Sequence, residues 1–259
     1  MKFARFTYKN KTSFGIVEDN RLKVIVGDPF EKWSYSGEQV SIDEVKLLSP
    51  VAPKKIIGIG ANYVEKKELV PSQLPEIPVF FLKPSSSVIG PETPVSLPEG
   101  LDEIKFESEL AIVIGKEAKN VEKEDVLDHI FGYTIGNDVT APQYFHSDGH
   151  WTLGKAFDTF TPLGPVIETE LDPSSVFVKA DVNGEQKQNS PTECMIVPLR
   201  EMVSYLSKVM TLHTGDVILT GSPLGAHFVK HGDVVKCHID EIGSLTNSIT
   251  RSKSTVNVQ

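Results

Sequence analysis

The sequence has few cysteines and no long hydrophobic run. Only Cys194 and Cys237 occur among the 259 residues, and they lie far apart in the chain. There is no charged leader followed by an apolar stretch, so we expect reduced thiols in a cytoplasmic protein and no disulfide. No apolar run reaches the roughly 18 residues that a membrane-spanning helix needs. Internal repeats and low-complexity tracts are also missing.

Positive charge is scarce as well. Lys and Arg total 26 against 35 acidic residues, which gives a formal net charge of −9. This balance argues against nucleic acid and anionic membrane surfaces as partners. An acidic protein has no overall attraction for an organic acid, so any positive charge in a pocket must be local. A divalent ion and one or two lysines would supply it.

The composition favours a fold that is mostly β with few helices, of the α+β class. The chain has 17 prolines and 19 glycines spread along it, which suits many short strands and turns. Three short strand candidates lie within the first 50 residues, at 3–8, 12–17 and 22–26. We therefore expect a small N-terminal β region over residues 1–50 and a main domain over residues 51–259.

Several later segments have clear patterns. Residues 176–182 alternate with period two and run into Asn183-Gly184, a strong signal for a hairpin turn. Residues 197–210 carry apolar side chains at helical spacing, which predicts an amphipathic helix whose methionines face the core. Further strands are predicted at 55–60, 217–220 and 234–238.

Two glutamates define the candidate site. Glu107 and Glu109 lie at the start of a predicted strand, just before the apolar run of residues 110–115. Side chains two apart on a strand share a face, about 7 Å apart along it. Burying two such like charges unpaired would cost several kcal/mol. The pair therefore either binds a cation or lies on a solvated strand face.

A third carboxylate follows a later strand. We expect a helix over about Val121 to Ile130, with Asn120 as its N-cap, and then a strand over residues 131–136 whose end carries Asp138. Three oxygen donors with no cysteine or suitably spaced histidine nearby favour a hard cation, Mg²⁺ or Mn²⁺. The pattern predicts a metal site only if the three acids meet.

The order of several short motifs resembles the fumarylacetoacetate hydrolase family, including its 2-hydroxyhepta-2,4-diene-1,7-dioate isomerase, 5-carboxymethyl-2-hydroxymuconate isomerase and acylpyruvase members. Each motif alone is weak, but together they cover roughly residues 50 to 245. They are Gly60-Ala61-Asn62-Tyr63, Phe81-Leu82-Lys83-Pro84-Ser85, Glu107-Ser108-Glu109, Gly136-Asn137-Asp138-Val139-Thr140, Trp151-Thr152-Leu153-Gly154-Lys155, Phe157 to Pro165, Val182-Asn183-Gly184 and Gly215 to Pro223.

The resemblance implies the mixed β-roll of the family's C-terminal domain and a divalent ion, Mg²⁺ or Mn²⁺, held by Glu107, Glu109 and Asp138. It also implies a homodimer and a role in the catabolism of aromatic compounds. Lys155 matches the family's active-site lysine. The substrate-binding positions that it implies are Tyr63, Lys155, Thr220 and Gly221.

Two departures from the family pattern bear on the reaction. The family covers the metal with a mobile lid, which corresponds here to residues 64–78, and hydrolytic members use a His and a Glu on it to activate water. The His position is Lys66 here and the Glu position is Leu69, so that Glu68 is the nearest acid and no imidazole remains. In addition, an arginine that follows the third ligand in many members is missing, since this chain reads Thr140-Ala141-Pro142-Gln143. His146 and His150 follow, and we interpret them as ordinary loop histidines.

An intact triad without the lid pair favours reactions that need an enolate but no attacking water. The resemblance then predicts a metal-dependent isomerase, tautomerase or decarboxylating lyase acting on a small 2-oxo diacid, with Lys66 as a candidate proton donor. One alternative is a hydrolase of acylpyruvate-like C–C bonds that uses Glu65 or Glu68 as a base. Another is a catalytically silent protein that binds metal and an organic acid.

Overall fold

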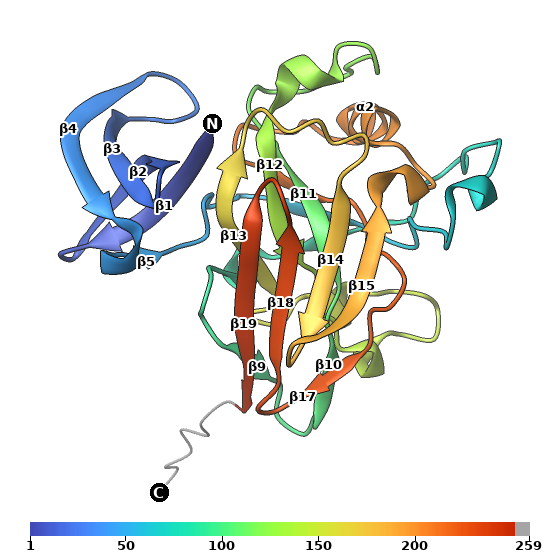
Figure 1. The fold of residues 1–259 in the computed structure, drawn as a ribbon. Helices are drawn as coiled ribbons and strands as arrows, with labels where there is room; N and C mark the ends of the chain where they lie inside the picture. Colours follow the sequence, from blue (N-terminus) through green and yellow to red (C-terminus); the bar gives the residue numbers. More distant parts are fainter. Residues whose placement is uncertain (252–259) are drawn as a thin grey trace, which may run out of the picture.

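The computed structural model describes residues 1–251, and these form a mostly β protein as expected. The chain begins with an antiparallel meander, drawn in blue at the left of Figure 1. Its strands are β1 (Lys2–Tyr8), β2 (Lys11–Glu18), β3 (Arg21–Gly27), β4 (Trp33–Ser41) and the short β5 (Lys46–Leu47), which pairs with β1. The three strands predicted in this region are confirmed, whereas β4 was not anticipated.

The meander continues into the main sheet, because β1 pairs with β13 through Lys2 opposite Glu168 and Phe3 opposite Ile167. The strand order is β4-β3-β2-β1-β13-β12-β11-β16-β6-β7. The strands of its second half are β6 (Ile56–Ile59), β7 (Phe80–Lys83), β11 (Ser108–Ile114), β12 (Ile130–Asn137), β13 (Thr161–Glu168) and β16 (Val217–Leu219). All seven residues of β11 are buried, so this strand lies at the centre of the core.

A second sheet packs across the main one, with β14, β18 and β19 in front of it in Figure 1. Its order is β15-β14-β18-β19-β9. The bounds are β9 (Val95–Leu97), β14 (Phe177–Val182), β15 (Glu185–Pro191), β18 (Val234–Ile239) and β19 (Gly243–Arg251). The predicted hairpin is confirmed, since Asn183 and Gly184 both adopt positive φ, at 51° and 83°, between β14 and β15.

Smaller elements complete the fold. The strands β10 (Glu103–Lys105) and β17 (Phe228–Lys230) pair with each other, and β8 (Val88–Ile89) runs parallel to β13. The helices are α1 (Thr152–Lys155), α2 (Leu199–Val209) and the 3-10 turns at Ile42–Glu44, Lys67–Leu69, Ser85–Ser87, Val126–His129, Pro142–Tyr144 and Thr192–Cys194. Among residues 1–251, no helix combines the length and the apolar character that crossing a membrane requires.

The predicted core helix is confirmed as α2, which buries Met202, Val203 and Leu206. Both cysteines are buried free thiols, in agreement with the expectation from the sequence.

The helix predicted over residues 121–130 is wrong. Only Val126–His129 form a 3-10 turn, and Asn120 has a φ of 53° and does not act as an N-cap. The backbone N–H groups of Asn120 and Val121 donate to Ser207 of α2, to its carbonyl at 3.0 Å and its hydroxyl at 2.9 Å. Carbonyls that a helix would pair internally also bond to α2, because the Val121 carbonyl accepts from the Ser204 hydroxyl at 2.8 Å and the Lys123 and Glu124 carbonyls accept from Arg200. Packing against α2 thus overrides the weak helical pattern.

Candidate active site

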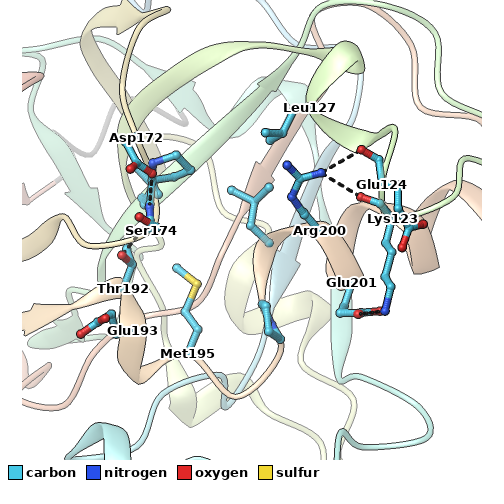
Figure 2. A pocket seen from close by; sticks show the side chains of 14 residues that line it. Lys123, Glu124, Leu127, Asp172, Ser174, Thr192, Glu193, Met195, Arg200 and Glu201 are labelled. Carbon is cyan, nitrogen blue, oxygen red and sulfur yellow. Dashed lines mark hydrogen bonds and ion pairs between the residues drawn. The ribbon is translucent and has the colours of Figure 1, made fainter.

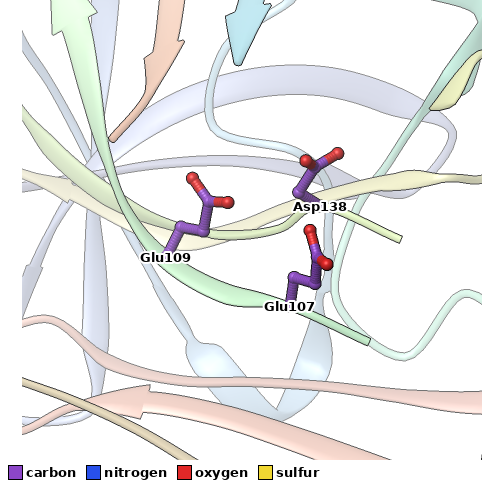
Figure 3. Close-up of side chains that lie close together, drawn as sticks. All are labelled: Glu107, Glu109 and Asp138. Carbon is purple, nitrogen blue, oxygen red and sulfur yellow. The ribbon is translucent and has the colours of Figure 1, made fainter. Parts of the chain in front are cut away.

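Two neighbouring strands bring the three acids together. Glu109 lies on β11 opposite Gly136 of β12, and Glu107 comes directly before β11. The Glu107 N–H donates to Asn137 Oδ1 at 2.9 Å, and the Asp138 N–H donates to the Glu107 carbonyl at 2.8 Å. As a result the three carboxylates offer oxygen atoms within 4.8 Å of one another (Figure 3). The prediction that they meet is therefore confirmed.

Two lysines neutralise part of this cluster. Lys155, at the end of α1, donates to Glu107 Oε2 at 2.7 Å and also to Asp138 Oδ2. Lys83, at the end of β7, donates to Asp138 Oδ1 at 2.5 Å and to the carbonyl of Val139 at 3.2 Å. The resemblance gave a role to Lys155 but none to Lys83, although Lys83 lies within the family motif of residues 81–85.

Burial and neighbouring charges shift the pKa values of these groups in opposite directions. Burial raises the pKa of Glu109 well above its usual value, and the charges of Asp138 and Glu107 add to the effect. Burial alone would also raise the pKa of Asp138, but the Lys155 and Lys83 ammonium groups outweigh it and lower that pKa. Burial lowers the pKa of Lys83, against the attraction of Asp138. The cluster is thus short of positive charge near Glu109.

The cluster lines a cavity of about 480 Å³. One wall is aromatic, because the rings of Phe145 and Trp151 stack at 5.6 Å and Phe81 lies 5.8 Å from Trp151. The Lys155 ammonium lies 4.8 Å from the centre of the Phe81 ring. Gly60 permits this wall, since a Cβ there would lie 2.1 Å from Trp151 Cζ3. The remaining lining residues are Ile59, Ala61, Tyr63, Lys105 and the loop of residues 222–226.

Tyr63 lines the cavity and has an uncommitted hydroxyl. The side chain is buried, and its hydroxyl oxygen has no hydrogen-bond partner among the described residues. Burial raises the pKa of Tyr63, and the nearby Glu109 charge raises it further. The hydroxyl is therefore a neutral donor, buried within a residue that lines the cavity.

Two predicted substrate contacts are arranged differently. The Thr220 hydroxyl donates to the Leu110 carbonyl at 2.8 Å, and Thr220 is fully buried outside the cavity lining. The pairing of β16 with β11 turns it toward the sheet, so the hydroxyl is not available to a substrate. The Gly221 N–H donates to Glu109 Oε2 at 2.7 Å, which makes Gly221 a support for the carboxylate.

The predicted lid residues also lie away from the acids. Lys66 and Glu68 are exposed and do not line the cavity, nor does Glu65. The segment of residues 64–78 projects at the right of Figure 1, and Lys67 donates there to Glu193 at 2.7 Å. This arrangement keeps the candidate proton donor Lys66 and the candidate bases Glu65 and Glu68 out of the site. His146 and His150 likewise lie on an exposed loop outside the cavity lining.

A second cavity of about 720 Å³ lies beside α2 (Figure 2). Its polar groups are committed to one another: Arg200 Nη1 donates to the carbonyls of Lys123 and Glu124, and Asp172 accepts from the Ser174 N–H. Apolar side chains complete the lining, among them Leu127 and Met195, which lie at opposite ends of the view in Figure 2. No carboxylate cluster borders this cavity in the described chain, so we place the chemistry in the smaller one.

The three acids fit a divalent cation by their chemistry. They supply only oxygen donors from one short pair of strands, which is the donor set that Mg²⁺ and Mn²⁺ prefer. Burial of Glu109 without a cationic hydrogen-bond partner leaves a charge that such an ion would balance.

Comparisons with known proteins point in the same direction. A family model described as fumarylacetoacetate (FAA) hydrolase C-terminal matches residues 55–250, and one described as Rv2993c-like, N-terminal, matches residues 1–50. A solved structure of 5-carboxymethyl-2-hydroxymuconate delta-isomerase from Mycobacterium smegmatis has a TM-score of 0.91 and 39% identity, over 97% of this chain and 100% of that one.

Two further similarities concern activity and metal. An oxaloacetate tautomerase of Xenopus laevis, fahd2, is 42% identical over 81% of this chain and 70% of that protein. A maleylpyruvate hydrolase from Sphingobium sp. SYK-6, solved in complex with manganese(II) and pyruvate, has a TM-score of 0.81 and 31% identity, over 98% of this chain and 100% of that one.

Proposed function

Because the chain belongs to the fumarylacetoacetate hydrolase family, we propose that it is a tautomerase or isomerase of small 2-oxo acids that depends on Mg²⁺ or Mn²⁺. The observation that carries this proposal is the convergence of Glu107, Glu109 and Asp138 beside Lys155 in one cavity. The tautomerase and isomerase activities named for similar proteins support the same class of reaction.

The residues of the site suit the chemistry of an enol and its keto form. When bound, the divalent ion would act as a Lewis acid that stabilises negative charge on the 2-oxo oxygen. Lys155 adds a buried ammonium beside the acids, which favours a substrate carboxylate. The burial of Glu109, Asp138 and Lys155 strengthens both interactions.

We assign the proton transfer to Tyr63, whose buried hydroxyl has no partner among the described residues. In the enol-to-keto direction, its neutral hydroxyl gives a proton to C3 of the substrate. The proton of the enol hydroxyl leaves to solvent, and solvent returns one to the phenolate. The reverse reaction follows the same path backwards. This role fits a residue that lines the cavity and whose hydroxyl has no other partner among the described residues.

Hydrolysis has weaker support. An attacking water needs a base, and no histidine lines the cavity within residues 1–251. Glu65 and Glu68 lie outside it as well. Decarboxylation of a β-keto acid needs only the same enolate stabilisation, so we keep it as a second activity of the proposed site. We also expect a homodimer, which light scattering would test.

The direct experiment follows the ultraviolet absorbance of enol-oxaloacetate as it converts to the keto form with Mg²⁺ or Mn²⁺. We expect turnover that Glu109→Gln abolishes, whereas Glu103→Gln, at an exposed position nearby, leaves it intact. Decarboxylation is measured in parallel as pyruvate formed. Absence of both reactions, and of isomerisation of 2-hydroxymuconate-type acids, would leave only metal and organic acid binding.

A further inference from the structure

The three lysines around the acids differ in what they can still bind. Lys83 is out of solvent contact and uses its ammonium on Asp138 and the Val139 carbonyl. Lys155 is 4% exposed and contacts two carboxylates. Lys105 is 34% exposed, and its Nζ has one acidic partner, Glu107 Oε1 at 3.1 Å. An ammonium group has three donors, so Lys105 keeps two of them free, more than Lys83 or Lys155, and it is the most exposed of the three lysines.

The backbone fixes the position of Lys105. Its N–H donates to the Thr140 carbonyl at 2.7 Å, and the Thr140 N–H donates back to the Lys105 carbonyl at 2.9 Å. The strand also pairs Lys105 with Phe228 of β17, and the Gln143 side chain donates to the Glu103 carbonyl at 3.3 Å. The backbone of Lys105 is thus held against Thr140, two residues after Asp138 in the chain. In the segment that follows, Pro142 and Gln143 provide no cation.

The charges around the cavity indicate the kind of ligand. Three carboxylates face three lysines, Lys83, Lys105 and Lys155, so these side chains balance when all are ionised. A divalent ion would leave two positive charges in excess. A ligand with two negative charges restores neutrality, whereas one carboxylate leaves an uncompensated charge in a partly dry site.

We propose that Lys105 binds the distal carboxylate of a dicarboxylic 2-oxo acid and thereby selects diacids over monoacids. This inference rests on the proposed function, since the 2-oxo acid end of the ligand must lie at the acids and Lys155. Lys105 is then a specificity residue, and its greater exposure than Lys83 and Lys155 suits the end of the ligand that does not react.

A matched pair of ligands tests this assignment without turnover. Oxamate and N-oxalylglycine share the same oxalyl end, but only N-oxalylglycine carries a second carboxylate. Their affinities for the full chain loaded with Mn²⁺ are measured by calorimetry for the wild type, Lys105→Met and Lys105→Arg. Lys208→Met serves as the control, because Lys208 also pairs with one glutamate, Glu122 at 3.2 Å, far from the cavity.

We expect Lys105→Met to weaken the binding of N-oxalylglycine about 10- to 100-fold, which is the range for a lost hydrogen bond to a charged group. The affinity for oxamate should change less than about twofold. Lys105→Arg should restore most of the loss and Lys208→Met should change neither ligand. Equal effects on both ligands, or none, would overturn the role of Lys105. If the wild type binds neither ligand, the proposed function itself fails. Circular dichroism of each variant shows whether a loss of binding comes from misfolding.

Discussion

The ammonium of Lys83 donates to Asp138 Oδ1 at 2.5 Å, with both side chains out of contact with solvent. Removing one member of a buried ion pair leaves the other charge less compensated, and Lys155 can offset only part of the loss. We expect Lys83→Met to lower the free energy of unfolding by about 3 kcal/mol, measured by urea denaturation of the metal-free protein.

The same substitution should weaken Mn²⁺ binding about tenfold or more, because Asp138 loses the contact that fixes its carboxylate. Lys208→Met is again the control. Loss of this exposed ion pair should lower the free energy of unfolding by less than about 0.5 kcal/mol. A Lys83→Met protein as stable as the wild type would show that the pair contributes nothing.

Tyr63→Phe removes one oxygen atom from the cavity wall. The hydroxyl makes no hydrogen bond, so stability should stay the same or rise slightly. Loss of a positioned proton donor should lower kcat by about 100-fold or more, with Mn²⁺ affinity unchanged. Electron paramagnetic resonance gives the metal affinity and the enol-oxaloacetate assay gives kcat. A variant with unchanged kcat would assign the proton transfer to another group.

Cys237 should resist alkylation in the native protein. Burial raises the pKa of its thiol to about 12, so only about one molecule in ten thousand carries the thiolate at pH 8. The side chain is also 1% exposed. Iodoacetamide labelling with peptide mapping should find it unmodified at pH 8 and fully modified in urea. Labelling should increase only as the pH approaches the raised pKa, and rapid native labelling would contradict the burial.

The acidic cluster could be predicted because its signals are local. The period of two along a strand places Glu107 and Glu109 together, and the end of the next strand delivers Asp138. The helix expected after Asn120 failed because its carbonyls accept from Ser204 and Arg200 of α2, which lie 76 or more residues away. A local sequence pattern does not indicate a hydrogen-bond partner so far along the chain.

The lysines show the same division. Lys83 and Lys155 both lie in family motifs, but the resemblance gave a role only to Lys155. Lys83 contacts Asp138 because the fold brings the end of β7 to the residue that follows β12. Lys105 was missed because its role depends on which charges remain exposed once the fold has formed. Thr220 was expected to face a substrate, but the alignment of β16 with β11 directs its hydroxyl to the Leu110 carbonyl.

The most direct test of the proposed site is a calorimetric titration of chelator-stripped protein with Mg²⁺ and then Mn²⁺, followed by oxalate, a mimic of the pyruvate enolate. We expect one ion per chain, oxalate binding only to the loaded protein, and loss of both in Glu109→Gln. If the stripped protein binds no metal, or binds oxalate equally well without it, the three carboxylates do not form an enolate-stabilising site.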